Sequence, residues 1–141
     1  MIRKLQNRDI DRVAQIWFEA NKEAHNFIPE IYWEGKYEEV KSMLPQAEVH
    51  VYEVQGEIEA FVGVVDAYIA GIFVSNLSQS RGIGKVLLDY LKNDKSILIL
   101  SVYKKNERAK KFYEREGFKV VSEKIDEDTS EKEFVMKWKK L

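Results

Sequence analysis

The stretch Gln79-Ser80-Arg81-Gly82-Ile83-Gly84-Lys85 joins an apolar run, residues 69–74, to a segment with helical periodicity. The apolar positions of that segment are Val86, Leu87, Leu88 and Leu91. A strand, a glycine-bearing loop and a helix N-terminus in this order form an anion site, because free backbone N–H groups and the helix dipole both favour negative charge. Gly82 and Gly84 let the backbone come close to a ligand. The stretch therefore predicts a site for a phosphate or pyrophosphate.

Two common phosphate-binding loops are excluded by spacing. A P-loop needs Gly-x-x-x-x-Gly-Lys-Ser/Thr, but Gln79 stands five residues before Gly84, and Val86 follows Lys85. The loop therefore lacks the hydroxyl that would hold magnesium, which disfavours a nucleotide-dependent kinase. A dinucleotide fingerprint needs a third glycine, and Leu87 occupies that position.

The pattern Gln-x-x-Gly-x-Gly instead resembles the coenzyme A pyrophosphate loop of the GNAT superfamily of N-acetyltransferases. A second segment, 106–118, reads Asn-x-x-Ala-x-x-Phe-Tyr-x-x-x-Gly-Phe and is similar to the other signature of that superfamily. It also makes sense on local grounds, since Asn106 is a good N-cap and Gly117 a good C′ residue. The two segments stand in the family order, with a short predicted strand, Ile97–Val102, between them.

Composition sets broad limits. The 141 residues are 45% hydrophobic and carry a net charge of −1, which indicates one domain without a field that would attract DNA or RNA. There is no cysteine, and His25 and His50 are the only histidines, so no metal site is expected. The polar start and the lack of an apolar run near the roughly 20 residues of a membrane span predict a soluble, cytoplasmic protein with no membrane partner.

The periodicity along the chain predicts seven strands and four helices. The expected strands cover 2–5, 49–54, 58–65, 69–74, 97–102, 118–124 and 133–139, and the helices cover 10–24, 31–44, a segment opening at 79–85, and 107–116. The order β-α-α-β-β-β-α-β-α-β-β is the GNAT order. The resemblance thus spans the chain and implies a single GNAT domain, 1–141, of α/β (α+β) class with a mixed central sheet flanked by helices.

The resemblance implies how acetyl-CoA is bound. It places the pyrophosphate on the amides of Arg81 to Lys85, the pantetheine arm along Phe73 and Val74, and Asn106 in contact with coenzyme A. The expected cofactor-binding residues are Phe73, Val74, Gln79, Ser80, Arg81, Gly82, Ile83, Gly84, Lys85 and Asn106. Gly71 would either ease a β-bulge or admit a large neighbour. Four lysines of the second segment either form a solvated face or meet the phosphates: Lys104, Lys105, Lys110 and Lys111.

Tyr113 is the candidate general acid, because a phenol with a pKa near 10 stays protonated at neutral pH and can protonate a leaving thiolate. Many relatives use a glutamate on the central strand as the base, but residues 68–74 carry no acid. His25, Asp66 and Tyr68 remain as candidates, and His25 could instead form a local hydrogen bond at the end of its helix. Tyr68 could instead orient the acceptor or a water.

The predicted activity is transfer of acetyl from acetyl-CoA to a primary amine by direct attack in a ternary complex, since no cysteine is present to carry the acetyl group. The segment 24–28 with Tyr32-Trp33 resembles the acceptor side of small bacterial GNAT enzymes, some of which acetylate protein lysines. A protein lysine, a protein N-terminus, a polyamine, an amino acid and an aminoglycoside all remain open as acceptors, as do monomer and homodimer. The alternative is a non-catalytic module that senses acyl-CoA or regulates a partner.

Overall fold

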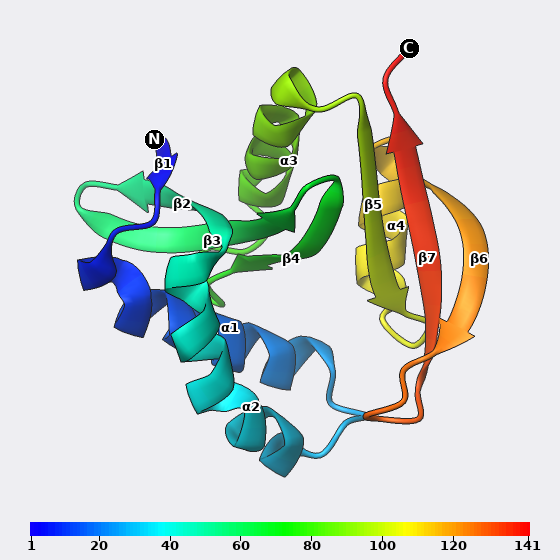
Figure 1. Cartoon of the computed structure of the whole chain (residues 1–141), viewed down its shortest axis with the longest axis horizontal. Coiled ribbons are helices and arrows are strands. Elements are labelled where there is room, and N and C mark those ends of the chain that lie inside the picture. Colours follow the sequence, from blue (N-terminus) through cyan, green and yellow to red (C-terminus); the bar gives the residue numbers. More distant parts are fainter.

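The computed structural model describes all residues, 1–141, and shows one twisted seven-stranded sheet with helices on both faces (Figure 1). The strands are β1 (Ile2–Lys4), β2 (Glu48–Val54), β3 (Glu57–Val65), β4 (Tyr68–Val74), β5 (Ile97–Tyr103), β6 (Lys119–Ile125) and β7 (Lys132–Lys139). The helices are α1 (Ile10–Ala24), α2 (Glu30–Met43), α3 (Ile83–Asp94) and α4 (Glu107–Arg115), with short 3-10 turns η1 (Asn7–Asp9) and η2 (Leu44–Gln46). The predicted order of elements is confirmed.

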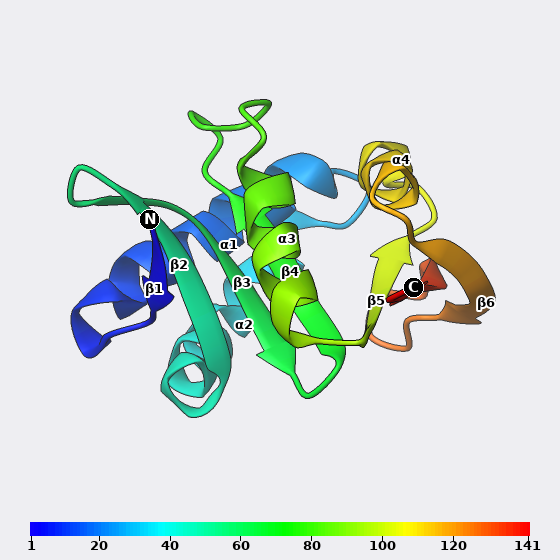
Figure 2. The ribbon, with the colours of Figure 1, turned by 90° about the horizontal axis from the view of Figure 1, so that it is seen from above.

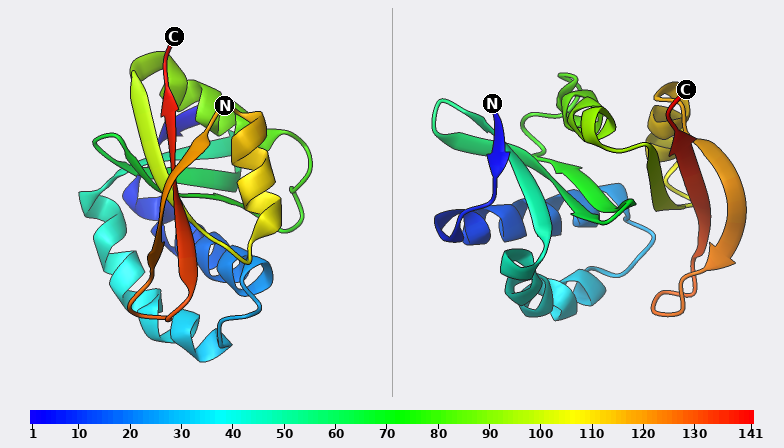
Figure 3. Two further views of the ribbon diagram at one scale, coloured as in Figure 1. Left: turned by 90° about the vertical axis from the view of Figure 1, so that its right-hand side faces the viewer. Right: turned by 45° about the horizontal axis from the view of Figure 1, so that its top comes forward.

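The strands lie in the order β1-β2-β3-β4-β5-β7-β6, and every neighbouring pair is antiparallel except β4 and β5. These two strands pair only at Tyr68 with Ile99 and at Ile69 with Leu100. Beyond this point β4 follows β3 and β5 follows β7, so the two parallel strands diverge (Figures 1 and 3). The sheet therefore has two halves that separate toward the carboxyl ends of β4 and β5. The space between the unpaired parts of these two strands is the β4–β5 opening.

Alternating side chains build a separate core on each face of the sheet. On one face α3 and α4 cover Leu98, Leu100 and Val102 of β5, together with buried residues of β3 and β4. On the other face α1 packs on β2 and β3 (Figure 2). The buried side chains of this second core are Val13, Ala14, Ile16, Leu44, Val49, Val51, Ile58 and Phe61. None of the helices is long and apolar enough to cross a membrane.

The predicted element boundaries were accurate to about one residue. The second helix ends at Met43, because Pro45 lies inside the 3-10 turn that begins at Leu44. The sixth strand begins at Lys119 rather than at Phe118. Phe118 is buried, and its N–H donates to the carbonyl of Tyr113 at 3.0 Å, which completes the end of α4.

Candidate functional site

Along the edge of β4 that faces away from β3, backbone N–H and C=O groups past the short pairing with β5 have no partner strand. The N–H of Ser75, one residue past β4, donates to the carbonyl of Glu59 at 2.8 Å, so this position faces β3. Since backbone groups alternate in direction along a strand, Phe73 also faces β3, whereas Ile72 and Val74 face the opening toward β5. The Val74 carbonyl accepts from Gln79 Nε2 at 3.3 Å, as expected for a group on the open side. Of the two predicted pantetheine neighbours, Val74 thus presents its amide to the opening and Phe73 does not.

Gly71 marks an irregularity in β4 at which both predicted reasons for a glycine are confirmed. Gly63 pairs with Gly71, but Val64 pairs with Ile69, so Ala70 is an extra residue and forms a β-bulge. The ring of Phe73 lies where a side chain at Gly71 would stand. The bulge bends β4 away from β5 at the point where the two strands separate.

The start of α3 has the backbone arrangement that the loop sequence predicts. Gly82 is the N-cap residue, with a φ of +78° that other residues adopt with strain, and no side chain caps the helix. No group of the protein accepts a hydrogen bond from the amides of Gly82 to Lys85. Unpaired amides at the positive end of a helix suit a pyrophosphate group. The site is built from backbone, so it depends on loop conformation more than on side-chain identity.

Cations near this helix start differ in how far they are already paired. Lys85 lies 3.1 Å from Glu116 and 3.3 Å from Asp89, and hydrogen bonds to these carboxylates raise its pKa. Arg81 is exposed and has no carboxylate partner. Arg108 of α4 donates to the Ser80 hydroxyl at 3.0 Å and so brings a second cation to the loop. Arg81 is therefore the free cation of this stretch, rather than Lys85.

The lysines of the second motif are mostly paired with glutamates. Lys104 lies 3.3 Å from Glu123, Lys105 lies 3.2 Å from Glu131 and Lys110 lies 3.3 Å from Glu114. Only Lys111 of the four has no ion pair. This arrangement agrees with a solvated helix face for three of them.

Tyr113 lies on the inner face of α4, with its ring between those of Phe112 and Phe118, at 5.2 and 5.5 Å. Its hydroxyl makes no hydrogen bond, and it is not among the enclosed unpaired atoms, which are Trp33 Nε1 and His50 Nδ1. The hydroxyl is therefore open to a partner from outside the chain. Burial of the ring raises the pKa of Tyr113 above its ordinary value, so the phenol is protonated at neutral pH.

Asn106 and His25 are joined across the opening, although they lie 81 residues apart. Asn106 is the N-cap of α4, as predicted, and its Oδ1 accepts from the Ala109 amide at 3.2 Å. Its Nδ2 lies 3.0 Å from His25 Nε2, and His25 Nδ1 lies 3.1 Å from Asn21 Oδ1. Burial lowers the pKa of His25 to about 4. A histidine with this pKa and both ring nitrogens engaged does not suit a general base near neutral pH.

The other two candidate bases lie at the closed end of the opening. Tyr68, at the start of β4, donates its hydroxyl to Ser101 on β5 at 3.2 Å. Asp66 occupies the exposed turn before β4, and its carbonyl accepts from Lys95 at 2.7 Å. Tyr68 can reach the place where the strands separate, whereas Asp66 lies on the turn that precedes it.

Several residues at this site gave no recognisable sequence signal. Ile72 contributes an open amide only because the bulge at Ala70 shifts the strand, and Ser101 is a small polar residue within a mostly apolar strand. Asn21 lies four residues before His25 on the same helix, and this spacing could have indicated their contact. Tyr103 is a further aromatic at this opening, with its ring 4.9 Å from that of His25.

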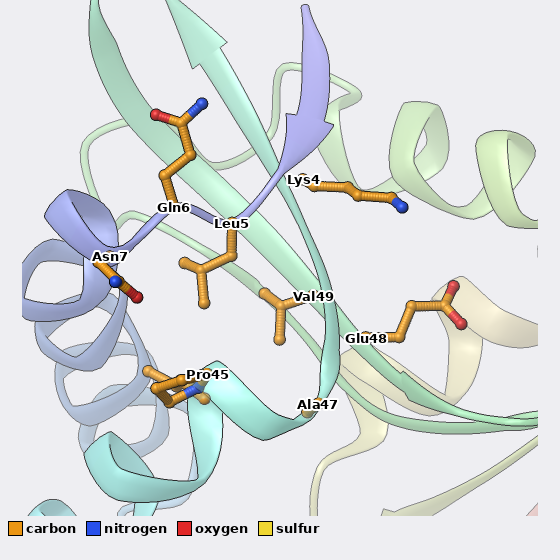
Figure 4. Close-up of a pocket in the computed structure, with 9 residues that line it drawn as sticks. Lys4, Leu5, Gln6, Asn7, Pro45, Ala47, Glu48 and Val49 are labelled. Carbon is orange, nitrogen blue, oxygen red and sulfur yellow. The ribbon is translucent and has the colours of Figure 1, made fainter.

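A separate cavity of about 290 Å³ lies near the junction of β1 and β2, away from the β4–β5 opening (Figure 4). Leu5, Pro45 and Val49 point into it, whereas Lys4 and Glu48 point away. No group of three or more histidine, aspartate or glutamate side chains is arranged to hold a metal ion. The unpaired amides at the start of α3 and the open backbone groups of Ile72 and Val74 do not line this cavity.

Comparison with known proteins agrees with this geometry. Residues 45–120 match the acetyltransferase (GNAT) domain family. Peptidyl-lysine N-acetyltransferase YiaC of Escherichia coli is 31% identical over 140 residues, which cover 98% of this chain and 96% of YiaC. Apo-form YjaB of Escherichia coli has the same fold, with a TM-score of 0.89 at 22% identity over 100% of this chain and 98% of YjaB.

A structure with bound coenzyme A also shares the fold. The PaiA N-acetyltransferase of Thermoplasma acidophilum in complex with coenzyme A superimposes with a TM-score of 0.82 at 23% identity, covering 99% of this chain and 98% of PaiA. The chain belongs to the GNAT acetyltransferase family and transfers an acetyl group from acetyl-CoA to an amine.

Proposed function

We propose that the acceptor is the side-chain amine of lysine in proteins, and that the amine attacks acetyl-CoA directly in a ternary complex. The observation that carries the binding of acetyl-CoA is the set of unpaired amides from Gly82 to Lys85 beside the open edge of β4. The choice of lysine is supported by the 31% identity with a peptidyl-lysine N-acetyltransferase over 98% of the chain. A cytoplasmic location, where acetyl-CoA and protein lysines meet, belongs to the same proposal, as does a monomer or homodimer.

Backbone groups would hold the acetyl donor. The amides of Gly82 to Lys85 suit the pyrophosphate, and Arg81 adds a free positive charge. The open amides of Ile72 and Val74 suit the pantetheine arm, as an added strand would pair with them. Acetyl-CoA supplies the activated thioester. A preformed amide at this edge can also donate to the carbonyl oxygen as negative charge develops there.

The chemical step forms a C–N bond and breaks the C–S bond. The departing thiolate takes its proton from Tyr113, whose hydroxyl is unpaired and protonated at neutral pH. The ammonium proton of the acceptor passes to water, because His25 has no free ring nitrogen. Tyr68, which donates to Ser101 where β4 and β5 separate, orients this water or the amine.

Thiol release from acetyl-CoA, followed with a panel of lysine peptides and small amines, tests the proposal. We expect release with peptides that contain an internal lysine, and a mass increase of one acetyl group on that lysine. Peptides with lysine replaced by arginine serve as the control. Release with small amines alone would contradict the choice of acceptor. Tight coenzyme A binding without release for any amine would favour the non-catalytic module.

A further inference from the structure

The side-chain hydrogen bonds around His25 form one chain whose direction is fixed at both ends. At one end the Trp17 carbonyl, which can only accept, lies 2.9 Å from Asn21 Nδ2. At the other end the Ala109 amide, which can only donate, lies 3.2 Å from Asn106 Oδ1. Asn21 must therefore present its Oδ1 to His25, and Asn106 must present its Nδ2.

These two contacts determine the proton of the imidazole. Asn21 Oδ1 needs a donor, so the proton is on His25 Nδ1, and Asn106 Nδ2 needs an acceptor, so His25 Nε2 carries the lone pair. If Nε2 were protonated, its N–H would point at an N–H of Asn106 Nδ2, and neither group could accept a hydrogen bond. The neutral ring with its proton on Nδ1 is the state that satisfies every member of the chain.

The surroundings of His25 favour the same state. The ring packs against Phe27 at 5.7 Å, Trp33 at 5.6 Å and Tyr103 at 4.9 Å. Among these rings only Tyr103 is titratable, and its hydroxyl donates to Asp126 at 2.7 Å. The Nζ of Lys105 lies over the ring of Phe27, 5.5 Å from the ring centroid. No carboxylate contacts the imidazole, so nothing compensates a charge on it.

The contact joins the two halves of the divided sheet. His25 follows α1, which packs under β2 and β3, whereas Asn106 begins α4, which packs on β5 and carries Tyr113. Beyond the two residue pairs of β4 and β5, no backbone pairing holds these halves together. The 3.0 Å bond from Asn106 to His25 ties the acceptor-side connection, residues 25–29, to the N-terminus of α4.

We infer that His25 is a positioning residue, a neutral imidazole that holds the Asn106 cap of α4 against the acceptor side of the opening. It acts on the reaction through Asn106 and α4 rather than by taking a proton. A kinetic test of this role rests on the proposed function, since it requires an amine that the enzyme acetylates. An NMR test of the imidazole proton requires only the protein itself.

The proton position is measured by ¹⁵N NMR of the two imidazoles, with His25 assigned from the signals lost in His25→Phe. We expect His25 to carry its proton on Nδ1 and to stay neutral down to about pH 5. The variant Asn106→Asp keeps an oxygen for the Ala109 amide but replaces the Nδ2 donor. Its carboxylate should hold His25 as the imidazolium at neutral pH. A proton on Nε2 in the unaltered protein, or identical titrations in both, would overturn the inference.

Two substitutions separate positioning from packing and from base catalysis. His25→Phe keeps the aromatic contacts but removes both hydrogen bonds, whereas His25→Gln carries one donor and one acceptor. We expect kcat/KM for the acceptor to fall about tenfold in His25→Phe and to recover to within about threefold in His25→Gln. The Kd for coenzyme A, measured by calorimetry, should change less than about twofold in both, because the amides of α3 are untouched.

The pH–rate profile decides the remaining alternative. With His25 as a positioning residue, both variants keep the acid limb of the unaltered protein. Loss of that limb in both would identify His25 as the base and overturn the inference. Normal kcat/KM in a folded His25→Phe protein would show that the ring only packs. Failure of every peptide as acceptor would contradict the proposed function while leaving the spectroscopic result standing.

Discussion

The ring of Phe73 occupies the space into which a side chain at Gly71 would project, two residues before it on the same strand. Phe73 is fixed from its other side by Phe61, with ring centroids 5.2 Å apart. The bulge at Ala70 lies next to this contact, near the point where β4 and β5 stop pairing. A methyl group at residue 71 would therefore displace the Phe73 ring close to the opening of the sheet.

Gly71→Ala should lower the free energy of unfolding by about 1–3 kcal/mol, because Phe73 must leave its place or the strand must shift. Urea unfolding measures this change. Gly35→Ala is the matched control, since Gly35 lies within α2 with no atom within 4 Å of the added methyl. It should gain about 0.5–1 kcal/mol from helix propensity. Equal effects at both positions would show that Phe73 does not constrain Gly71.

Arg81→Ala should weaken coenzyme A binding by roughly 1.5–3 kcal/mol, the value of a charge-assisted hydrogen bond, without a loss of stability. Isothermal titration measures the affinity, and Arg8→Ala, another exposed arginine without a carboxylate partner, is the control. Gly84→Glu is a poorer test. A side chain there points toward Phe112, at 3.4 Å, so it should destabilise the contact of α3 with α4 as well as block binding. Unchanged affinity in Arg81→Ala would remove Arg81 from the binding site.

Local signals in the sequence were sufficient for the fold. The N-cap Asn106 and the glycine at 117, which has a φ of +95°, bound α4 as predicted, because capping depends on residues within one turn. The order of elements followed from hydrophobic periodicity, which each segment carries by itself.

Contacts distant in sequence could not be predicted in the same way. Lys85 was placed in the anion loop from local pattern, whereas the pairing of its side chain with Glu116, 31 residues away, depends on the packing of α3 on α4. His25 was a candidate either for the base or for a local hydrogen bond at the end of its helix, and its contact with Asn106 depends on how the two halves of the sheet close. Which backbone groups of Phe73 and Val74 face the opening depends on the bulge at Ala70. Each of these details concerns the direction of a side chain or amide rather than the element that carries it.

Tyr113→Phe should lower kcat by about 10²–10⁴-fold, the range for loss of a general acid, with little change in the Kd for coenzyme A. Stability should also change little, because the hydroxyl has no hydrogen bond within the protein to lose. Tyr90→Phe is the control, since Tyr90 is exposed on α3 and packs beside His50. Single-turnover thiol release gives the rate of the chemical step. A rate near that of the unaltered protein would make Tyr113 a packing residue and assign the thiolate's proton to water.

The stability of the protein should fall as the pH falls from about 6.5 toward 4, because burial lowers the pKa of His25 to about 4. In the unfolded chain this histidine takes up a proton below its ordinary pKa near 6.5, whereas the folded protein resists it. The unfolded state therefore binds more protons in this window, and the free energy of unfolding decreases by about 2 kcal/mol between pH 7 and pH 5. Carboxylates with a lowered pKa, such as Asp9 and Glu53, lose their stabilising effect mainly below about pH 5, outside the interval from pH 7 to pH 5.

Urea unfolding at pH 7 and pH 5 measures this decrease, and comparison with His25→Phe and His25→Gln isolates the contribution of the imidazole. Both variants lack the titrating ring, whereas every other group is the same, including Glu133, whose pKa is raised by burial. The unaltered protein should lose about 2 kcal/mol more than either variant over this interval. Parallel losses in all three would show that His25 takes up its proton as readily in the folded protein as in the unfolded chain, and that the bond from Asn106 does not keep it neutral.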